Sequence, residues 1–193
     1  MSEFGLYFQL GVEHILDTRG YDHILFIIAL CVIYNAREWS RVLILVTAFT
    51  IGHSITLVLA TLELISVRTD VVEFLIPVTI LITATNNIFS KPSSGTRRIQ
   101  VNYLFALFFG LIHGLGFSNY LKSLLGTDSS VITQLFAFNI GIEAGQIIIV
   151  GIYMIVAFIA NGIFYISRRD WVMVISSAIA GIAFILIIEN KFW

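Results

Sequence analysis

The chain places every one of its four histidines inside or at the edge of a strongly apolar segment: His14, His23, His53 and His113. The first two directly follow a carboxylate residue, Glu13 and Asp22. An imidazole ring is costly to bury in hydrocarbon, so an ionisable residue at membrane depth is by default a candidate functional residue. Neutral imidazole is also the commonest metal ligand in proteins. The pattern therefore predicts a metal site buried in a membrane protein.

A carboxylate in the longest apolar run supports this prediction. Glu143 follows Asn139 and precedes Gln146 at i, i+4, i+7 spacing, so the three side chains share one face of a helix. A carboxylate near mid-membrane needs a cation or a proton to offset its burial. The predicted metal ligands are His14, Asp22, His23, His53, His113 and Glu143. The predicted secondary polar lining is Asn139, Gln146, Ser54, Asn86 and Asn87.

The ligand types suit a divalent transition metal. Three histidines and a carboxylate at tetrahedral reach suit Zn²⁺, whereas octahedral completion by Asp22, Asn139, Gln146 or water suits Ni²⁺ or Co²⁺. The residue types alone leave the choice among nickel, cobalt and zinc open.

The composition indicates what kind of scaffold must position these residues. Of the 193 residues, 58% are hydrophobic and 12% are charged, whereas a soluble domain has about 25% charged residues. We expect an all-α polytopic membrane bundle that forms a single transmembrane domain over residues 1–193 and has the lipid bilayer as its surroundings. The net charge of −1 gives no reason to expect a nucleic-acid partner. Homo-oligomer formation stays open.

Apolar runs of about 20 residues mark the expected membrane spans. About six transmembrane helices are expected, over Tyr21–Ala36, Ser40–Leu62, Val71–Ser90, Ile99–Tyr120, Val131–Ala160 and Trp171–Ile188. The mixed stretch Phe4–Thr18 predicts a short interfacial or partly inserted helix, with Gly20 as the break before the first span.

Basic residues predict the orientation of these spans. The loops after the first, third and fifth spans carry most of the lysine and arginine residues: Arg37, Arg41, Lys91, Arg97, Arg98, Arg168 and Arg169. Cytoplasmic loops are enriched in lysine and arginine. Both termini are therefore expected outside the cytoplasm of a multi-pass inner-membrane protein.

Each of these residues also has a purely structural interpretation. His53 alone is compatible with a hydrogen-bonding role between helices, and Asp22-His23 with a helix cap at the interface. The small-residue spacings Gly110/Gly114 and Gly141/Gly145 are typical of closely packed membrane helices. Close packing is also compatible with a functional site, because it brings side chains of different helices together.

Five sequence blocks resemble a known family. They are Gly11-Val12-Glu13-His14-Ile15, Gly20-Tyr21-Asp22-His23-Ile24-Leu25-Phe26, Thr47 to Leu57 around His53, Phe109 to Phe117 around His113, and Phe138 to Gln146 around Glu143. The blocks resemble the HupE/UreJ-type membrane proteins of bacteria and cover nearly the whole chain. The resemblance implies nickel or cobalt uptake, with metal handling at His14, Asp22, His23, His53, His113 and Glu143.

Two features depart from this family pattern. The chain begins Met1-Ser2-Glu3-Phe4 without a histidine-rich segment, and Thr83 to Asn87 carries no carboxylate where relatives often have one near Asn86.

Three hypotheses follow from the residues. The first is uptake of a divalent metal, with His14, Asp22 and His23 at the outer mouth. In this hypothesis His53, His113 and Glu143 bind the ion deeper within the bundle, and Asn86 and Asn87 line the inner exit. The second is a zinc-dependent intramembrane hydrolase with the same ligands, in which Glu143 or Asp22 serves as general base. The third is a hydrogen-bonded network that only stabilises the bundle. A polar path to the cytoplasmic face favours uptake, whereas a dead-end pocket favours an enzyme.

Overall fold

Every regular element that the computed structural model describes is a helix, which confirms the all-α prediction. The described residues are 2–18, 20–89, 96–124 and 131–193, so the predicted span end Ser90 and the loop residue Lys91 lie outside them. The elements are α1 (Glu3–Leu16), α2 (Asp22–Cys31), the 3-10 helix η1 (Ala36–Glu38), α3 (Trp39–Thr61), α4 (Thr69–Phe89), α5 (Thr96–Leu124), α6 (Val131–Phe158), the π-helix η2 (Ile159–Ile163) and α7 (Arg168–Glu189).

Within the described residues, four helical segments are long and apolar enough to cross a membrane: Trp39–Thr61, Thr69–Phe89, Val131–Ile163 and Arg168–Glu189. Two shorter apolar segments accompany them, Asp22–Cys31 and Asn102–Ser118. The chain is thus built as a membrane protein, while the expected number of about six spans is not confirmed.

The first expected span is shorter than predicted. Tyr21–Ala36 was expected to form one helix, but α2 ends at Cys31 and measures only about 15 Å at 1.5 Å per residue. A new helical turn begins at Asn35, whose side chain and that of Glu38 form a reciprocal capping box. The local cap therefore ends the apolar run. Since a bilayer core is about 30 Å thick, α2 alone does not cross it.

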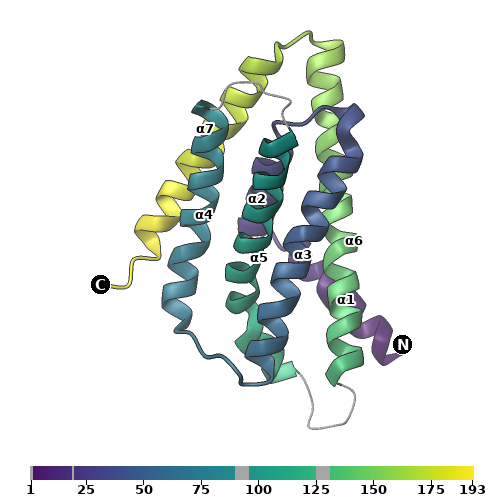
Figure 1. Ribbon diagram of the computed structural model, residues 1–193, viewed down its shortest axis with the longest axis vertical. Coiled ribbons are helices and arrows are strands. Elements are labelled where there is room, and N and C mark those ends of the chain that lie inside the picture. Colours follow the sequence, from purple (N-terminus) through teal and green to yellow (C-terminus); the bar gives the residue numbers. More distant parts are fainter. Residues whose placement is uncertain (1, 19, 90–95, 125–130) are drawn as a thin grey trace.

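Helix α1 packs along α6, and glycines make the contact close (Figure 1). A Cβ atom on Gly11 would lie 2.1 Å from the carbonyl oxygen of Phe138, and one on Gly141 would lie 2.1 Å from that of Phe8. Backbone thus meets backbone, as the small-residue spacing Gly141/Gly145 suggests.

Helices α3 and α5 form a second close pair. A Cβ atom on Gly110 would lie 2.2 Å from the carbonyl oxygen of Phe49, and one on Gly114 would lie 2.3 Å from that of His53. Gly52 makes the reciprocal contact, 2.1 Å from the carbonyl oxygen of Leu107. This contact fixes His53 of α3 next to the turn of α5 that carries His113.

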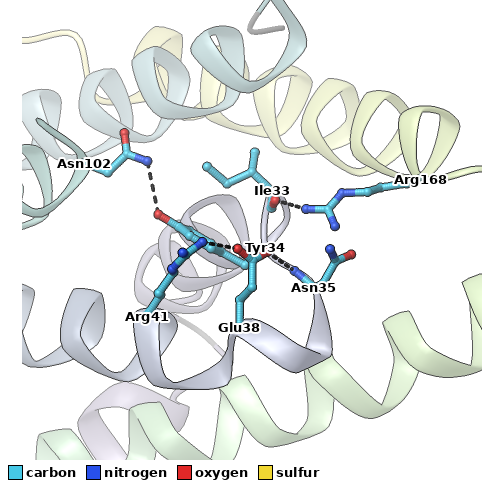
Figure 2. Close-up of polar contacts among 7 residues, drawn as sticks. All are labelled: Ile33, Tyr34, Asn35, Glu38, Arg41, Asn102 and Arg168. Carbon is cyan, nitrogen blue, oxygen red and sulfur yellow. Dashed lines mark hydrogen bonds and ion pairs between the residues drawn. The ribbon is translucent and has the colours of Figure 1, made fainter. Parts of the chain in front are cut away.

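The short helix α2 lies within the bundle and contacts α1, α3, α4, α6 and α7, whereas α7 packs mainly on α4 at the periphery (Figure 1). Arginines gather at the end of the bundle where α3 and α7 begin. Figure 2 shows this end: the Arg168 guanidinium donates to the backbone carbonyl of Ile33, and Arg41 pairs with Glu38. We call it the arginine end.

Candidate metal site

The four histidines come from four different helices and lie together in one cluster. The ring centroid of His23 is 4.6 Å from that of His14, 6.1 Å from that of His53 and 5.2 Å from that of His113. Their placement follows from the α3–α5 glycine contact and from the break between α1 and α2, which brings His14 and His23 side by side. The sequence predicts His14 and His23 at the outer mouth and His53 and His113 deeper in the bundle. The structure brings all four histidines into one cluster.

Three members of the cluster place candidate ligand atoms close together. One atom each from Asp22, His23 and His113 lies within 4.8 Å of the others. Two ligand atoms at about 2.1 Å from one ion are at most about 4.2 Å apart, so the observed spread is slightly wider than a bound ion requires. Side-chain rotation is sufficient to close this difference. The set fits a divalent transition metal.

Hydrogen bonding indicates which nitrogen of His113 is free to accept a metal. The Thr79 hydroxyl donates to the carbonyl oxygen of Ile76 at 2.7 Å, so its oxygen is left to accept. The Nε2 atom of His113 lies 3.4 Å from that oxygen and serves as the donor. The proton on Nε2 leaves a lone pair on Nδ1, and a lone pair is what a metal ligand needs.

His23 has the corresponding arrangement with a carboxylate. Its Nδ1 atom lies 3.3 Å from Oδ1 of Asp22, an acceptor, so Nδ1 carries the proton and Nε2 keeps the lone pair. A carboxylate that orients a histidine in this way is a recurrent feature of metal sites, because it fixes the tautomer and strengthens the ligand.

Five ring nitrogens of the cluster are buried without a hydrogen-bond partner among the described residues. Within the described part of the chain, no hydrogen bond reaches Nε2 of His14, Nε2 of His23, either nitrogen of His53 or Nδ1 of His113. His53 is 0% exposed and His113 is 1% exposed. Buried polar atoms are normally satisfied, and an unsatisfied group calls for an explanation such as an ion. This concentration of partnerless nitrogens around one carboxylate argues against a network that only stabilises the fold.

A cavity of about 800 Å³ opens onto the cluster. His14, Asp22, His23 and His113 line it together with three further acidic residues, Glu13, Asp17 and Glu73. Glu73 belongs to the first turns of α4, so the cavity lies toward the end of the bundle opposite the arginine end. We call this space the histidine cavity. Its acidic lining favours a cation over an anion.

The predicted polar residues of α6 face α3 instead of the histidines. Each accepts a hydrogen bond from a hydroxyl group of α3: Glu143 from Thr47 at 2.8 Å, Gln146 from Thr50 at 2.7 Å, and Asn139 from Ser54 at 2.7 Å. The predicted common face is therefore real, and it cross-links two helices. The structure does not bring Glu143 into the close set with Asp22, and its role as a ligand stays a prediction.

Two residues of the site were not foreseen from the sequence. Thr79 orients His113, and the ring of Phe117 lies 3.8 Å from that of His14, centroid to centroid. A threonine in an apolar helix and a phenylalanine in a membrane protein carry no distinguishing signal, because both occur at lipid-facing and buried positions.

The fold and the site define a helical membrane protein with a buried histidine-carboxylate cluster. The chain belongs to the HupE/UreJ protein family, whose model matches residues 1–190. This family is associated with nickel and cobalt transport. No curated protein and no solved structure matches the chain.

Proposed function

We propose that this protein carries a divalent transition metal ion, of the nickel, cobalt or zinc type, into the cell across the bacterial inner membrane. The ion enters the histidine cavity and is held by Asp22, His23 and His113, with His14 and His53 completing or exchanging ligands. The observation that carries the proposal is the cluster of buried, partnerless imidazole nitrogens around Asp22. Family membership supports it independently.

The backbone next to the cluster supports a transport role. Helix α1 ends at Leu16 and α2 starts at Asp22, and the described residues between them (17, 18, 20 and 21) are not helical. Asp17 and Gly20 of this break line the histidine cavity. Irregular backbone at membrane depth is tolerated only where it is buried in protein or lines a cavity. Transporters use such broken helices to build ion sites.

We place the arginine end of the bundle in the cytoplasm, following the enrichment of basic residues in cytoplasmic loops. The histidine cavity then opens outward and both termini lie outside the cytoplasm. The ion is a substrate in this proposal, so the cluster has to bind it weakly enough for release.

Asp22→Asn is expected to lower the initial rate of Co²⁺ uptake by about 10- to 100-fold, because the asparagine oxygen can still contact the ion whereas the charge that orients His23 is lost. The amide keeps the size of the side chain but removes the negative charge beside His23, and a divalent ion in a buried site needs that charge. The measurement is the entry of Co²⁺ into proteoliposomes that contain a metal-sensitive dye, repeated with Ni²⁺ and Zn²⁺.

Asp17→Asn is the matched control, because Asp17 lines the same cavity but is exposed. Its uptake should stay within about threefold of wild type, since solvent screens exposed charges. Equal losses in both variants would show that general acidity of the cavity matters and that Asp22 has no special role. Wild-type liposomes that take up none of the three ions would refute the transport proposal.

A zinc-dependent hydrolase is the second candidate, and one observation favours it. The histidine cavity is far larger than an ion needs, and apolar residues such as Leu10, Ile76 and Phe117 form part of its lining. A lipid or peptide substrate would fit such a space, with an ion activating water at the cluster. A metal that survives overnight chelation would favour this enzyme, because a resident catalytic ion is retained whereas a transported ion must leave.

A further inference from the structure

A second cavity lies on the other side of the histidine cluster and has a different chemistry. Its volume is about 150 Å³, and its polar lining consists of Thr83, Asn86 and Asn87 of α4 and Asn102 of α5. Apolar residues, among them Ala29 and Leu30 of α2, form the rest of the wall. We call it the amide cavity. All of its lining side chains are uncharged, in contrast to those of the histidine cavity.

Three phenylalanines separate the two cavities, which share no lining residue. The ring of Phe26 lies 5.1 Å from that of His113, and the ring of Phe49 lies 5.2 Å from it. Phe26 is in turn 5.7 Å from Phe109, which lines the amide cavity. The three side chains are at most 4% exposed. This phenylalanine layer closes the way between the cavities in the present structure.

Hydrogen bonds at the arginine end border the amide cavity on its other side, and Figure 2 shows these contacts. The Asn102 amide donates to the hydroxyl of Tyr34 at 3.1 Å, and Arg168 donates to the carbonyl of Ile33, a lining residue. Tyr34 is 9% exposed and lies between α2 and η1. The amide cavity is therefore a compartment bounded by aromatic rings on one side and by hydrogen bonds on the other.

Two of the three asparagines that line this cavity donate a hydrogen bond from the amide nitrogen to the protein. Asn87 donates its nitrogen to the carbonyl of Ala29 at 2.7 Å, and Asn102 donates its nitrogen to Tyr34. Figure 2 shows the oxygen of Asn102 on the side away from Tyr34. In each of these two amides the carbonyl oxygen is the atom that can contact a cation, because the amide nitrogen only donates. Carbonyl and hydroxyl oxygens are ligands for hydrated cations and, without a charge, hold them weakly.

We propose that the amide cavity is a second binding compartment for a partly hydrated divalent cation, which the ion reaches from the histidine cluster by passing the phenylalanine layer. A water molecule occupies about 30 Å³, so the volume accommodates an ion with a few of its waters. This inference rests on the proposed transport function. The inference also identifies where the ion is released on its way to the cytoplasm. There the ion moves from imidazole and carboxylate ligands to neutral oxygens, which hold it less tightly.

The test adds a carboxylate to the compartment and counts bound ions. Asn102→Asp is the first variant, because the Tyr34 hydroxyl can then donate to the new carboxylate and the local contact is kept. Wild type should bind one Co²⁺ per chain in equilibrium dialysis followed by metal analysis. Asn102→Asp should bind two. Asn35→Asp is the matched control: it adds the same charge at the same end of the bundle, but Asn35 is exposed and lines neither cavity. It should bind one.

Asn86→Asp provides a second carboxylate at the same compartment if Asn102→Asp does not fold, as judged by circular dichroism and gel filtration. The inference is overturned if folded variants of both positions bind no more Co²⁺ than wild type. Each variant is also made with His23→Ala and His113→Ala together. A Co²⁺ ion that remains bound in this background supports the amide compartment, even if the wild-type protein binds no metal. The double substitution therefore separates failure of the inference from failure of the proposed function.

Discussion

In His113→Ala protein, Co²⁺ binding is expected to be at least about 100-fold weaker than in wild type, because loss of a direct ligand exceeds the 10- to 100-fold effect of losing an orienting partner. His113 supplies one of the three closest candidate ligand atoms, and its Nδ1 is buried without a hydrogen-bond partner in the described residues. Alanine cannot replace it. Titration of purified protein in detergent by calorimetry measures the change.

Two companion variants make this result specific. Thr79→Val removes only the hydroxyl that orients His113 and should weaken binding by about 10- to 100-fold. Ser176→Ala changes a fully buried polar residue of α7 that lines neither cavity, and it should leave the affinity unchanged. Unaltered affinity in His113→Ala would place the metal elsewhere, and a loss in all three variants would indicate general destabilisation.

Gly114→Ala is expected to separate α3 from α5 and to abolish metal binding together with part of the stability. The new Cβ would lie 2.3 Å from the carbonyl oxygen of His53 and 2.3 Å from Oγ1 of Thr56. A backbone carbonyl cannot rotate away, so the helices must move. Overpacking of this kind costs about 1–3 kcal/mol. The shift also displaces His53 from His113. Melting temperature and Co²⁺ affinity in the same detergent report both effects.

Gly151→Ala is the matched control on α6, since a Cβ at Gly151 meets nothing within 4 Å. Alanine is also the better helix former, so the melting temperature should be unchanged or slightly higher. If Gly114→Ala behaved like Gly151→Ala, the close α3–α5 contact would be wrong, and with it the basis for placing His53 beside the cluster.

The long helices could be predicted from the sequence because a membrane span leaves a strong signal. The expected Ser40–Leu62 corresponds to α3 at Trp39–Thr61, and the expected Trp171–Ile188 lies within α7 at Arg168–Glu189. The early end of α2 could not be predicted in this way. The residues that follow Cys31, Val32 and Ile33, are still hydrophobic, so the apolar run does not end where α2 ends. The signal of the break is the capping pair Asn35 and Glu38.

The site could be predicted in its residue types but only partly in its geometry. A histidine in an apolar helix indicates a candidate functional residue whatever the packing, so the four histidines could be singled out from the sequence, whereas their meeting in one cluster could not. The hydrogen-bond partner of Glu143 could not be predicted from the sequence. Spacing places Asn139, Glu143 and Gln146 on one face of α6, but which helix meets that face depends on the packing of the whole bundle. The close glycine contact of Gly141 is made with α1, and the polar face meets the hydroxyls of α3.

The separation of Asp22 from Glu143 gives the two carboxylates different predicted roles in the bundle. Asp22 contacts His23 directly, whereas Glu143 is held by Thr47. Glu143→Gln keeps the hydrogen bond from Thr47 and removes the charge, so it tests the predicted ligand role of Glu143 without disturbing the α3–α6 contact.

Metal content of the purified protein tests the central claim most directly. The protein is isolated in detergent after exposure to Ni²⁺, Co²⁺ and Zn²⁺ in turn, freed of loose ions by gel filtration and analysed by mass spectrometry, beside the His23→Ala/His113→Ala double variant. A divalent metal site at the cluster predicts close to one ion per wild-type chain and none in the folded double variant. A folded wild-type protein that retains none of the three ions, or a double variant that retains as much as wild type, would contradict it.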